Sequence, residues 1–293
     1  MGNNGAELLV GGLTFGEGPR WHDDRLWLSD FYAHRVVSVG EQGDLRVEVQ
    51  LDDQPSGLGW LPDGRLMIVS MTRRLVLRLE PDGTIVTHAD LSDVAAFHCN
   101  DMVVDSVGRA YVGNFGFDLD AYFADRAAGT RTVERRPAVL ARVDPDGSVH
   151  VAADELHFPN GAVITPDGST LIVAETLGRR LTAFSIASDG TLRDRRTWAP
   201  LDHRAPDGIA LDANGNVWVA DASRTCCVLV AEGGDIVQTI DTPEPAYACM
   251  LGGHDGRTLF VLTAPTSVAH ELRGRTDACV RTVRVQVPGA GWP

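Results

Sequence analysis

The sequence has no long hydrophobic run and few basic residues. Among its 293 residues, no stretch approaches the roughly 18 consecutive apolar residues of a membrane-spanning helix, and residues 1–5 contain no apolar leader segment. Lys and Arg together number 26 against 40 Asp and Glu, which gives a formal net charge of −14. This charge disfavours binding to nucleic acid or to anionic membranes. We therefore expect a cytoplasmic monomer or small homo-oligomer whose partner is a small-molecule substrate, with neither nucleic acid nor membrane as a partner.

Motifs for thiolate metal sites and for serine nucleophiles are also missing. The sequence has no C-x-x-C pair, and its five cysteines are scattered at Cys99, Cys226, Cys227, Cys249 and Cys279. This spacing is poor for zinc, and the vicinal pair Cys226-Cys227 lies in a strand-like run where small apolar core residues are typical. No G-x-S-x-G motif surrounds Ser56 or Ser70, so these serines are expected to serve turns and strands.

The sequence contains one short motif, called the phrase below, that is repeated six times. In each copy, a turn of small residues is followed by two hydrophobic strands that are separated by a polar turn. The six copies begin with Gly16-Glu17-Gly18, Pro55-Ser56-Gly57, Cys99-Asn100-Asp101, Pro159-Asn160-Gly161, Pro206-Asp207-Gly208 and the degenerate Pro245-Ala246-Tyr247. Their second residues lie 39, 44, 60, 47 and 39 positions apart. A four-stranded propeller blade spans roughly 40 to 50 residues. The array therefore predicts an all-β, six-bladed β-propeller that occupies residues 1–293 as a single domain.

The two ends of the chain are predicted to close the ring. The last repeat offers strands at 248–250, 259–263 and 280–287, and residues 6–10 can supply the missing fourth strand of that blade. Such closure protects strand edges that would otherwise pair with other molecules. The long interval of 60 residues is explained by an insertion at about 115–137, which we expect to overhang the mouth of the central tunnel.

The second residue of each phrase opens the innermost strand of its blade, so equivalent side chains should meet at one mouth of the tunnel. Four of them carry oxygen ligands: Glu17, Asn100, Asn160 and Asp207. Any one of them alone would be typical of a polar turn residue, but four in register indicate a shared site. Two carboxylates and two amides suit one divalent cation, with Ca²⁺ favoured and Mg²⁺, Mn²⁺ or Zn²⁺ as alternatives.

These residues carry a resemblance to a known family. The matching positions are Glu17-Gly18-Pro19 with Trp21, Asn100-Asp101, Pro159-Asn160-Gly161 with Asp167-Gly168, and Pro206-Asp207-Gly208 with Asp221. Over essentially the whole chain, the pattern resembles the senescence marker protein/gluconolactonase/luciferin-regenerating enzyme family. The resemblance implies a six-bladed propeller that hydrolyses lactones, or in related branches phosphotriesters, with a divalent cation bound by Glu17, Asn160 and Asp207. It implies that Asn100 contacts either the substrate or the metal.

A cation in the tunnel would polarise a lactone carbonyl and lower the pKa of a nearby water, which requires no covalent nucleophile. Asp207 is the expected proton acceptor, because the family's Asp at this position is often assigned as ligand and general base together. The alternative base is His98, which lies two residues before Asn100 and is expected on the same rim.

His98 also separates this sequence from the sugar lactonases that it resembles, which commonly carry Arg at this position. The aromatic residues near it are Phe97, Phe115, Phe117 and Tyr122. Together they predict a lactone, or related cyclic ester, of a less polar acid than a sugar acid. Three alternatives stay open: a phosphotriesterase, a metal-assisted cyclase or isomerase, and a propeller that binds a ligand without catalysis.

Overall fold

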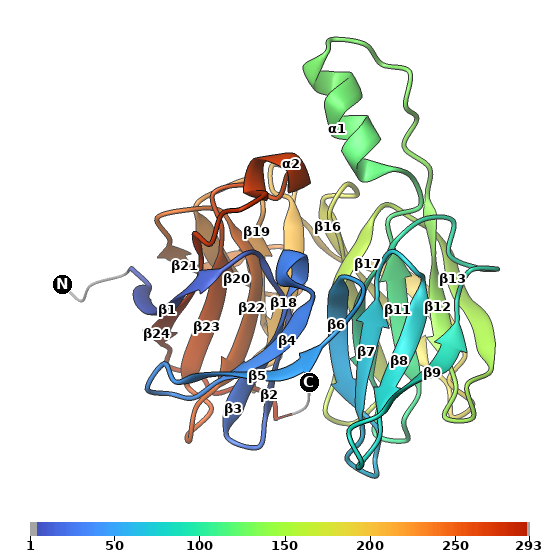
Figure 1. Cartoon of the computed structure of the whole chain (residues 1–293). Helices are drawn as coiled ribbons and strands as arrows, with labels where there is room; N and C mark the ends of the chain where they lie inside the picture. The colour runs from blue at the N-terminus through green and yellow to red at the C-terminus, as the bar shows by residue number, and fades with distance from the viewer. Residues whose placement is uncertain (1–4, 292–293) are drawn as a thin grey trace.

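The computed structural model describes residues 5–291, and these form six four-stranded antiparallel sheets arranged around a central axis (Figure 1). Residues 1–4 and 292–293 of the expected domain lie outside the described range. The innermost strand of each sheet contacts the innermost strand of the next, and the last contacts the first, so the ring is closed. The prediction of an all-β, six-bladed propeller is confirmed.

In the first five blades, strand order follows chain order from the axis outward. Blade one comprises β2 (Gly16–His22), β3 (Arg25–Asp30), β4 (Arg35–Val39) and β5 (Leu45–Gln50); blade two, β6 (Pro55–Trp60), β7 (Leu66–Ser70), β8 (Leu75–Leu79) and β9 (Ile85–Asp90); blade three, β10 (Cys99–Val104), β11 (Ala110–Asn114), β12 (Ala138–Val143) and β13 (Val149–Leu156). Blade four comprises β14 (Pro159–Ile164), β15 (Thr170–Glu175), β16 (Arg180–Ile186) and β17 (Leu192–Pro200), and blade five β18 (Pro206–Leu211), β19 (Val217–Asp221), β20 (Cys226–Val230) and β21 (Ile236–Asp241).

The sixth blade joins both ends of the chain. Its inner strands are β22 (Ala246–Gly252), β23 (Thr258–Thr263) and β24 (Ala278–Arg284), and its outer strand is β1 (Glu7–Leu13). β1 runs antiparallel to β24, with Val10 opposite Val280. The predicted closure by an N-terminal strand is therefore confirmed, with the strand extending further than residue 10.

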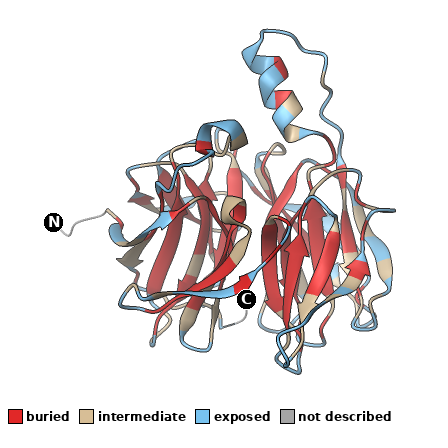
Figure 2. Cartoon of the chain, in the orientation of Figure 1, coloured by how far each residue is buried: buried red, intermediate tan, exposed pale blue. Residues whose placement is uncertain are grey.

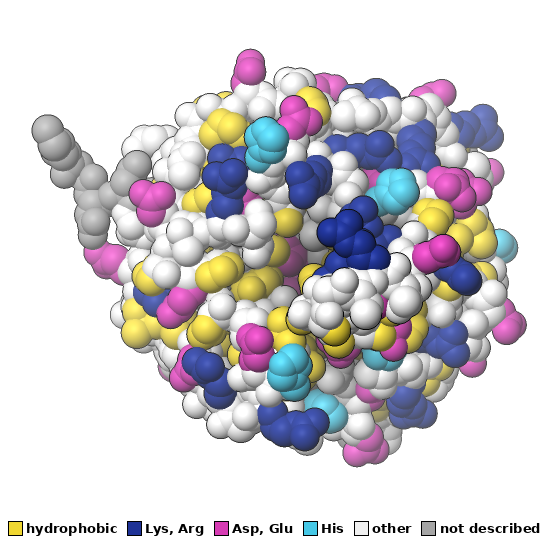
Figure 3. All heavy atoms as spheres, turned by 90° about the horizontal axis from the view of Figure 1, so that it is seen from above, with side chains coloured by type: hydrophobic (Ala, Val, Ile, Leu, Met, Phe, Trp, Pro, Cys, Tyr) yellow, Lys and Arg dark blue, Asp and Glu magenta, His cyan; other side chains and the backbone are white. Residues whose placement is uncertain are grey.

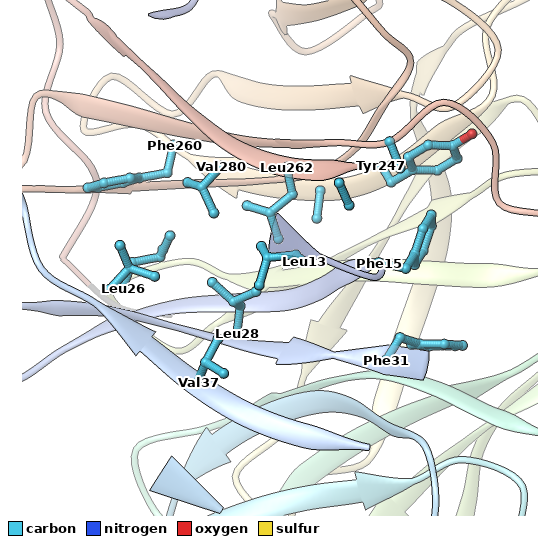
Figure 4. Close-up of a cluster of buried hydrophobic side chains, with 14 of the residues drawn as sticks. Leu13, Phe15, Leu26, Leu28, Phe31, Val37, Tyr247, Phe260, Leu262 and Val280 are labelled. Atoms are coloured by element: carbon cyan, nitrogen blue, oxygen red, sulfur yellow. The ribbon is translucent and has the colours of Figure 1, made fainter. Parts of the chain in front are cut away.

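Burial falls from the axis outward within each blade (Figure 2). The inner strands β10 and β14 are buried along their whole length, whereas most residues of the outer strand β5 are exposed. Between blades one and six, aliphatic side chains from both ends of the chain form one cluster, which includes Leu13, Leu28 and Leu262 (Figure 4). Removal of this apolar surface from water stabilises the closure of the ring.

Every blade carries the same irregularity next to the axis. Directly after the first or second residue of the inner strand, its pairing with the next strand shifts register, as between Glu17 and Arg20 in blade one and between Pro206 and Ile209 in blade five. A bulge of this kind re-aims nearby side chains. In the sixth blade, Ala246 pairs with Thr263 as Pro206 pairs with Asp221, so Tyr247 and not Ala246 is the equivalent of Asp207. The expected assignment of Ala246 to this position is wrong by one residue.

Two short helices lie on one side of the ring (Figure 1). α1 (Leu119–Ala127) belongs to the segment between β11 and β12, and its N-cap Asp118 accepts a hydrogen bond of 2.9 Å from the backbone N–H of Ala121. α2 (Ala269–Leu272) lies between β23 and β24, and η1 (Phe31–Ala33) follows β3. Within residues 5–291, neither helix approaches the length and apolar character required to cross a bilayer.

Close packing of the inner strands makes Gly161 sensitive to substitution. A Cβ atom there would lie 2.6 Å from the backbone nitrogen of Ile209 and 2.7 Å from the carbonyl oxygen of Asp207. Because backbone cannot move aside, Gly161→Ala is expected to lower the free energy of unfolding by about 2–3 kcal/mol in urea denaturation. Gly11→Ala is the matched control, since its Cβ would meet only the Cys279 Sγ at 3.5 Å. Equal effects of the two substitutions would contradict tight packing at the axis.

Candidate active site

The side chains predicted to form a site all line one cavity of about 400 Å³. Glu17, Asn100, Asn160 and Asp207 each stand second on an inner strand, on β2, β10, β14 and β18, and His98 precedes β10. The cavity opens on the side of the ring that carries α1 and α2, since Leu119 and Ala269 also line it. Figure 3 shows this face, with hydrophobic side chains around its hollowed centre.

The two amides belong to a chain of hydrogen bonds that runs around the axis. The Ser56 hydroxyl donates to Asn100 Oδ1 at 3.1 Å, and Asn100 Nδ2 donates to Asn160 Oδ1 at 2.9 Å. Asn160 Nδ2 donates to the Thr176 hydroxyl at 3.1 Å, which in turn donates to the carbonyl of Pro206 at 2.7 Å. An amide oxygen has two lone pairs, so Asn160 can accept this bond and still coordinate a cation.

Glu17 and Asp207 are buried carboxylates that repel each other. They are only 6% and 7% exposed, and burial raises the pKa of both groups well above the usual range. The charge of Asp207 raises the pKa of Glu17 further, and that of Asp101 raises both. Asp207 Oδ1 is buried and has no hydrogen-bond partner among residues 5–291. Such a pair is favourable when a cation balances it, so these residues fit a divalent metal.

The number of charged ligands is small. No group of three or more His, Cys, Asp or Glu side chains within residues 5–291 is arranged to hold a metal. A cation at the mouth of the tunnel would therefore depend on two carboxylates together with amide oxygens. This all-oxygen set is typical of Ca²⁺ or Mg²⁺ and unlike the usual ligands of structural zinc.

Two charged residues deeper in the tunnel are part of the same electrostatic system, and the sequence reasoning gave them no role. Asp101 on β10 and Arg20 on β2 are each 4% exposed. The charge of Arg20 opposes the effect of burial on the pKa of Asp101, which is nevertheless raised. With Glu17 and Asp207, three carboxylates face one guanidinium, which leaves two unbalanced negative charges when all are ionised. One divalent cation would neutralise them.

Tyr247 is the site residue that sequence reasoning missed. It occupies the sixth position of the ring, lines the cavity and packs its ring 4.8 Å from that of Phe15. Figure 4 shows its hydroxyl at the end of the ring turned away from the aliphatic cluster. Burial, together with the charge of Asp207, raises the pKa of Tyr247 to about 12. The degenerate sixth phrase is shifted by one residue relative to the other five phrases, and only the strand pairing reveals this shift.

Carboxylates at the ends of the second strands accept hydrogen bonds from the backbone segments that lead into the inner strands. Asp30 accepts from the backbone N–H of Thr14 at 2.8 Å, Glu175 from that of His157 at 2.7 Å, and Asp221 from that of Ala205 at 3.1 Å. Each bond fixes the segment that leads into an inner strand two or three residues before its site residue. These three carboxylates therefore position the site without lining its cavity.

His98 is half-buried at the rim of the cavity, with its ring stacked on Phe97 at 4.1 Å. Burial lowers the pKa of His98, while Asp118 and Asp120 of the insertion raise it. Its ring nitrogens hydrogen-bond to nothing in the described part of the chain. The charges that act on His98 therefore belong mainly to the insertion, and Glu17 and Asp207 are not among them.

The aromatic residues expected around the pocket divide into two groups. Phe97 and Phe115 line the cavity, and Phe115 meets Phe158 edge to face with ring centroids 4.7 Å apart. Phe117 and Tyr122 do not line it; they pack against each other at 5.5 Å inside the insertion. Leu119 and Phe123 of α1 instead extend the apolar rim.

The sequence predicts structural roles for the five cysteines and for Ser56 and Ser70. All five cysteines are free, and Cys226 and Cys227 are buried on β20, where they pack in the core. The Ser56 hydroxyl serves the amide chain described above, and the Ser70 hydroxyl donates to Asp53 at 2.6 Å.

The chain is similar to known proteins over most of its length. The family model described as SMP-30/Gluconolactonase/LRE-like region matches residues 15–265. Pentonolactonase XacC of Haloferax volcanii is 29% identical over 291 residues, which cover 95% of this chain and 92% of that protein. Regucalcin of Gallus gallus is 28% identical over 269 residues, or 89% and 86% of the two chains.

A solved gluconolactonase from Xanthomonas campestris is similar to this structure with a TM-score of 0.72 and 26% identity, over 96% of this chain and 88% of that one. Lactonases are thus among the relatives that align over nearly the whole ring. On the match over residues 15–265, the chain belongs to the SMP-30/gluconolactonase/LRE-like family.

Proposed function

We propose that this protein is a hydrolase that opens a lactone with the help of one divalent cation held by Glu17, Asn160 and Asp207, with Asn100 as a further ligand or substrate contact. The observation that supports this most is the pair of buried carboxylates with an unpartnered Asp207 oxygen at the cavity. Ca²⁺ suits an all-oxygen ligand set, and Mg²⁺, Mn²⁺ or Zn²⁺ are the alternatives. The protein acts on a small molecule as a monomer or small homo-oligomer.

The bound cation would supply a Lewis acid that polarises the lactone carbonyl and acidifies a water. Asp207 is the proposed acceptor of the proton from the attacking water, because it lines the cavity and its Oδ1 has no hydrogen-bond partner within the described residues. Asn100, fixed by Ser56 and Asn160, presents an amide to the substrate. Tyr247, with its pKa raised to about 12, keeps its proton at neutral pH and offers an O–H to a substrate oxygen.

The rim favours a substrate less polar than a sugar-acid lactone. Phe115, Phe158, Leu119 and Phe123 line the cavity above the carboxylates. Burial lowers the pKa of His98, which stands where the sugar lactonases commonly carry a cationic Arg. Apolar walls with a few polar groups at one end suit a lactone that carries an alkyl or aryl substituent. The relative from Haloferax volcanii is named for a pentonolactone, so the polarity of the substrate has to be tested directly.

Assays on a substrate panel test the proposed function. Purified protein is stripped with a chelator, reloaded with Ca²⁺, Mg²⁺, Mn²⁺ or Zn²⁺, and offered alkyl-substituted γ- and δ-lactones, glucono-δ-lactone and a phosphotriester. Alkyl lactones should give the highest kcat/KM, and the chelator should abolish turnover until a cation is restored. Faster turnover of gluconolactone would contradict the substrate class. Turnover of the phosphotriester alone, or an isomeric product in mass spectra, would favour the alternative reactions, and binding without turnover would favour a non-catalytic propeller.

Replacing His98 with Gln is expected to raise KM for an alkyl lactone about 5-fold while kcat changes less than about 2-fold, because a rim residue positions substrate. The acidic limb of the pH–rate profile should remain, since His98 has no hydrogen bond to Asn100 or Asp207. His203→Gln, at an exposed position, is the control and should change neither constant. A loss of about 10²-fold in kcat together with the acidic limb would assign the general base to His98 instead.

Replacing Tyr247 with Phe is expected to lower kcat about 10-fold for lactones whose leaving oxygen is an alkoxide, because the phenol no longer donates to it. Esters of acidic phenols, whose leaving oxygen needs no proton, should be hydrolysed at nearly the original rate. Cation affinity should not change. Equal losses on both substrates would contradict a donor function and leave Tyr247 as a packing partner of Phe15.

A further inference from the structure

A second cavity, of about 420 Å³, lies at the opposite mouth of the tunnel, where the inner strands end. Trp21 and His22 at the end of β2, Trp60 at the end of β6 and Met250 of β22 line it, and residues 289–291 border it. Its lining residues and those of the proposed active site do not overlap within the described chain. The proposed lactone chemistry makes no use of this cavity.

Its walls are rigid aromatic surfaces. Trp21 stacks on Phe260 with ring centroids 5.4 Å apart, and His22 stacks on Trp60 at 3.9 Å. Gly252 permits the position of Trp21, since a Cβ there would lie 2.4 Å from the indole. Two stacked pairs from different blades therefore form preorganised apolar walls, which favour binding of a flat apolar group.

A buried positive charge borders the same cavity. Arg20 is 4% exposed and lines the cavity, although its guanidinium is fixed by hydrogen bonds to the carbonyl of Pro19 at 2.7 Å and to that of Met102. Its Nε–H is buried and has no partner within the described residues. The charge of Asp101 raises the pKa of Arg20, and Asp101 Oδ1 is also buried without a hydrogen-bond partner within the described residues. A buried N–H without an acceptor is unfavourable, and an anionic ligand would supply that acceptor.

We infer that this second cavity binds a small carboxylate with a flat apolar body, its carboxylate directed to Arg20 and its apolar part against Trp21 and Trp60. A guanidinium beside a carboxylate forms a charge-assisted hydrogen bond, and the aromatic side chains offer apolar surface for a flat group. Two of the five N–H groups of Arg20 donate to backbone carbonyls, and the partnerless Nε–H can donate to one carboxylate oxygen. The carboxylates at the other mouth would repel the same ligand.

Titration with sodium benzoate tests this inference, with benzyl alcohol as the uncharged probe of similar shape. Tryptophan fluorescence and calorimetry should show benzoate binding at least about 10-fold more tightly than benzyl alcohol, in line with a hydrogen bond between charged groups. Arg20→Gln should remove this preference, and Arg46→Gln, at an exposed position, should keep it. Because Arg20→Gln could fail to fold, Trp60→Ala provides a second variant, which should weaken both probes and keep the preference.

Asp207→Ala removes a side chain that does not line the second cavity, so this variant should still bind benzoate more tightly than benzyl alcohol. This result holds whether or not the protein is a lactonase. Equal affinity for benzoate and benzyl alcohol would overturn the inference. So would loss of benzoate binding in Asp207→Ala, which would place the ligand in the cavity of the proposed active site.

Discussion

Replacement of Asp207 by Ala is expected to lower kcat/KM for lactone hydrolysis by about 10³-fold or more and to remove most of the bound cation. The substitution deletes one of two carboxylates in the proposed ligand set and, with it, the proposed proton acceptor. A cation held by so few charges loses a large part of its binding free energy when one is removed. Initial rates on an alkyl lactone and elemental analysis of the purified variant would measure the two effects.

Two further variants make this result interpretable. Asp202→Ala removes an exposed carboxylate from the loop just before β18 and should leave both rate and metal content unchanged. Asp207→Asn keeps the size of the side chain and removes only the charge and the basic oxygen, so it should resemble Asp207→Ala in rate with less effect on folding. Full metal occupancy together with normal turnover in Asp207→Ala would exclude Asp207 from both functions.

Once the proposed cation is removed, the free energy of unfolding is expected to decrease as the pH rises. Burial raises the pKa of Glu17 and Asp207 in the folded state, so the folded state holds these protons more tightly than the unfolded chain does. Their contribution to stability is therefore fully present below the unfolded pKa of about 4 and is lost as the pH rises through the folded pKa values. Carboxylates whose pKa is lowered, such as Asp53 and Glu175, are ionised in both states above about pH 5 and do not offset this trend.

Added Ca²⁺ should reverse this loss, and most strongly where both carboxylates are ionised. At about 100 times its Kd, a cation that binds only the folded state adds about 2.7 kcal/mol of stability. For a domain of this size we expect Tm to rise by about 5–10 °C at pH 8 and by much less at pH 5, in scanning calorimetry after chelation and reloading. The double variant Glu17→Gln, Asp207→Asn should show neither the pH trend nor the Ca²⁺ effect. Equal shifts at both pH values would contradict a cation bound between these groups.

The two mouths of the ring differ in charge, although the strands around them come from the same repeat. The mouth at which the inner strands begin has buried carboxylates with raised pKa values, and the mouth at which they end has a buried guanidinium among indole rings. A cation would therefore be attracted to the mouth that Glu17 and Asp207 border. This asymmetry arises within single strands, since Glu17 and Arg20 are three residues apart on β2.

The six-bladed ring and most of the residues that line its mouth could be predicted from the sequence alone. The spacing of the phrases and the polar turn inside each one predicted six blades, and closure by the N-terminal strand followed from a last blade that was one strand short. Glu17, Asn100, Asn160 and Asp207 could be grouped in advance because repeats around one axis bring equivalent positions together.

The contacts that each of these side chains makes at the mouth of the ring could be known only from the tertiary structure. Strand pairing assigned Tyr247 to the sixth position, and Phe117 and Tyr122 pack against each other inside the insertion and do not line the cavity. The raised pKa values of Glu17 and Asp207, and the hydrogen bond that fixes Arg20 Nη2, depend on residues 80 or more positions away, namely Asp101 and Met102. The spacing of the repeats determines the symmetry of the ring. The burial, strand register and electrostatic surroundings of each position depend on the neighbouring blade, and no local sequence pattern contains this information.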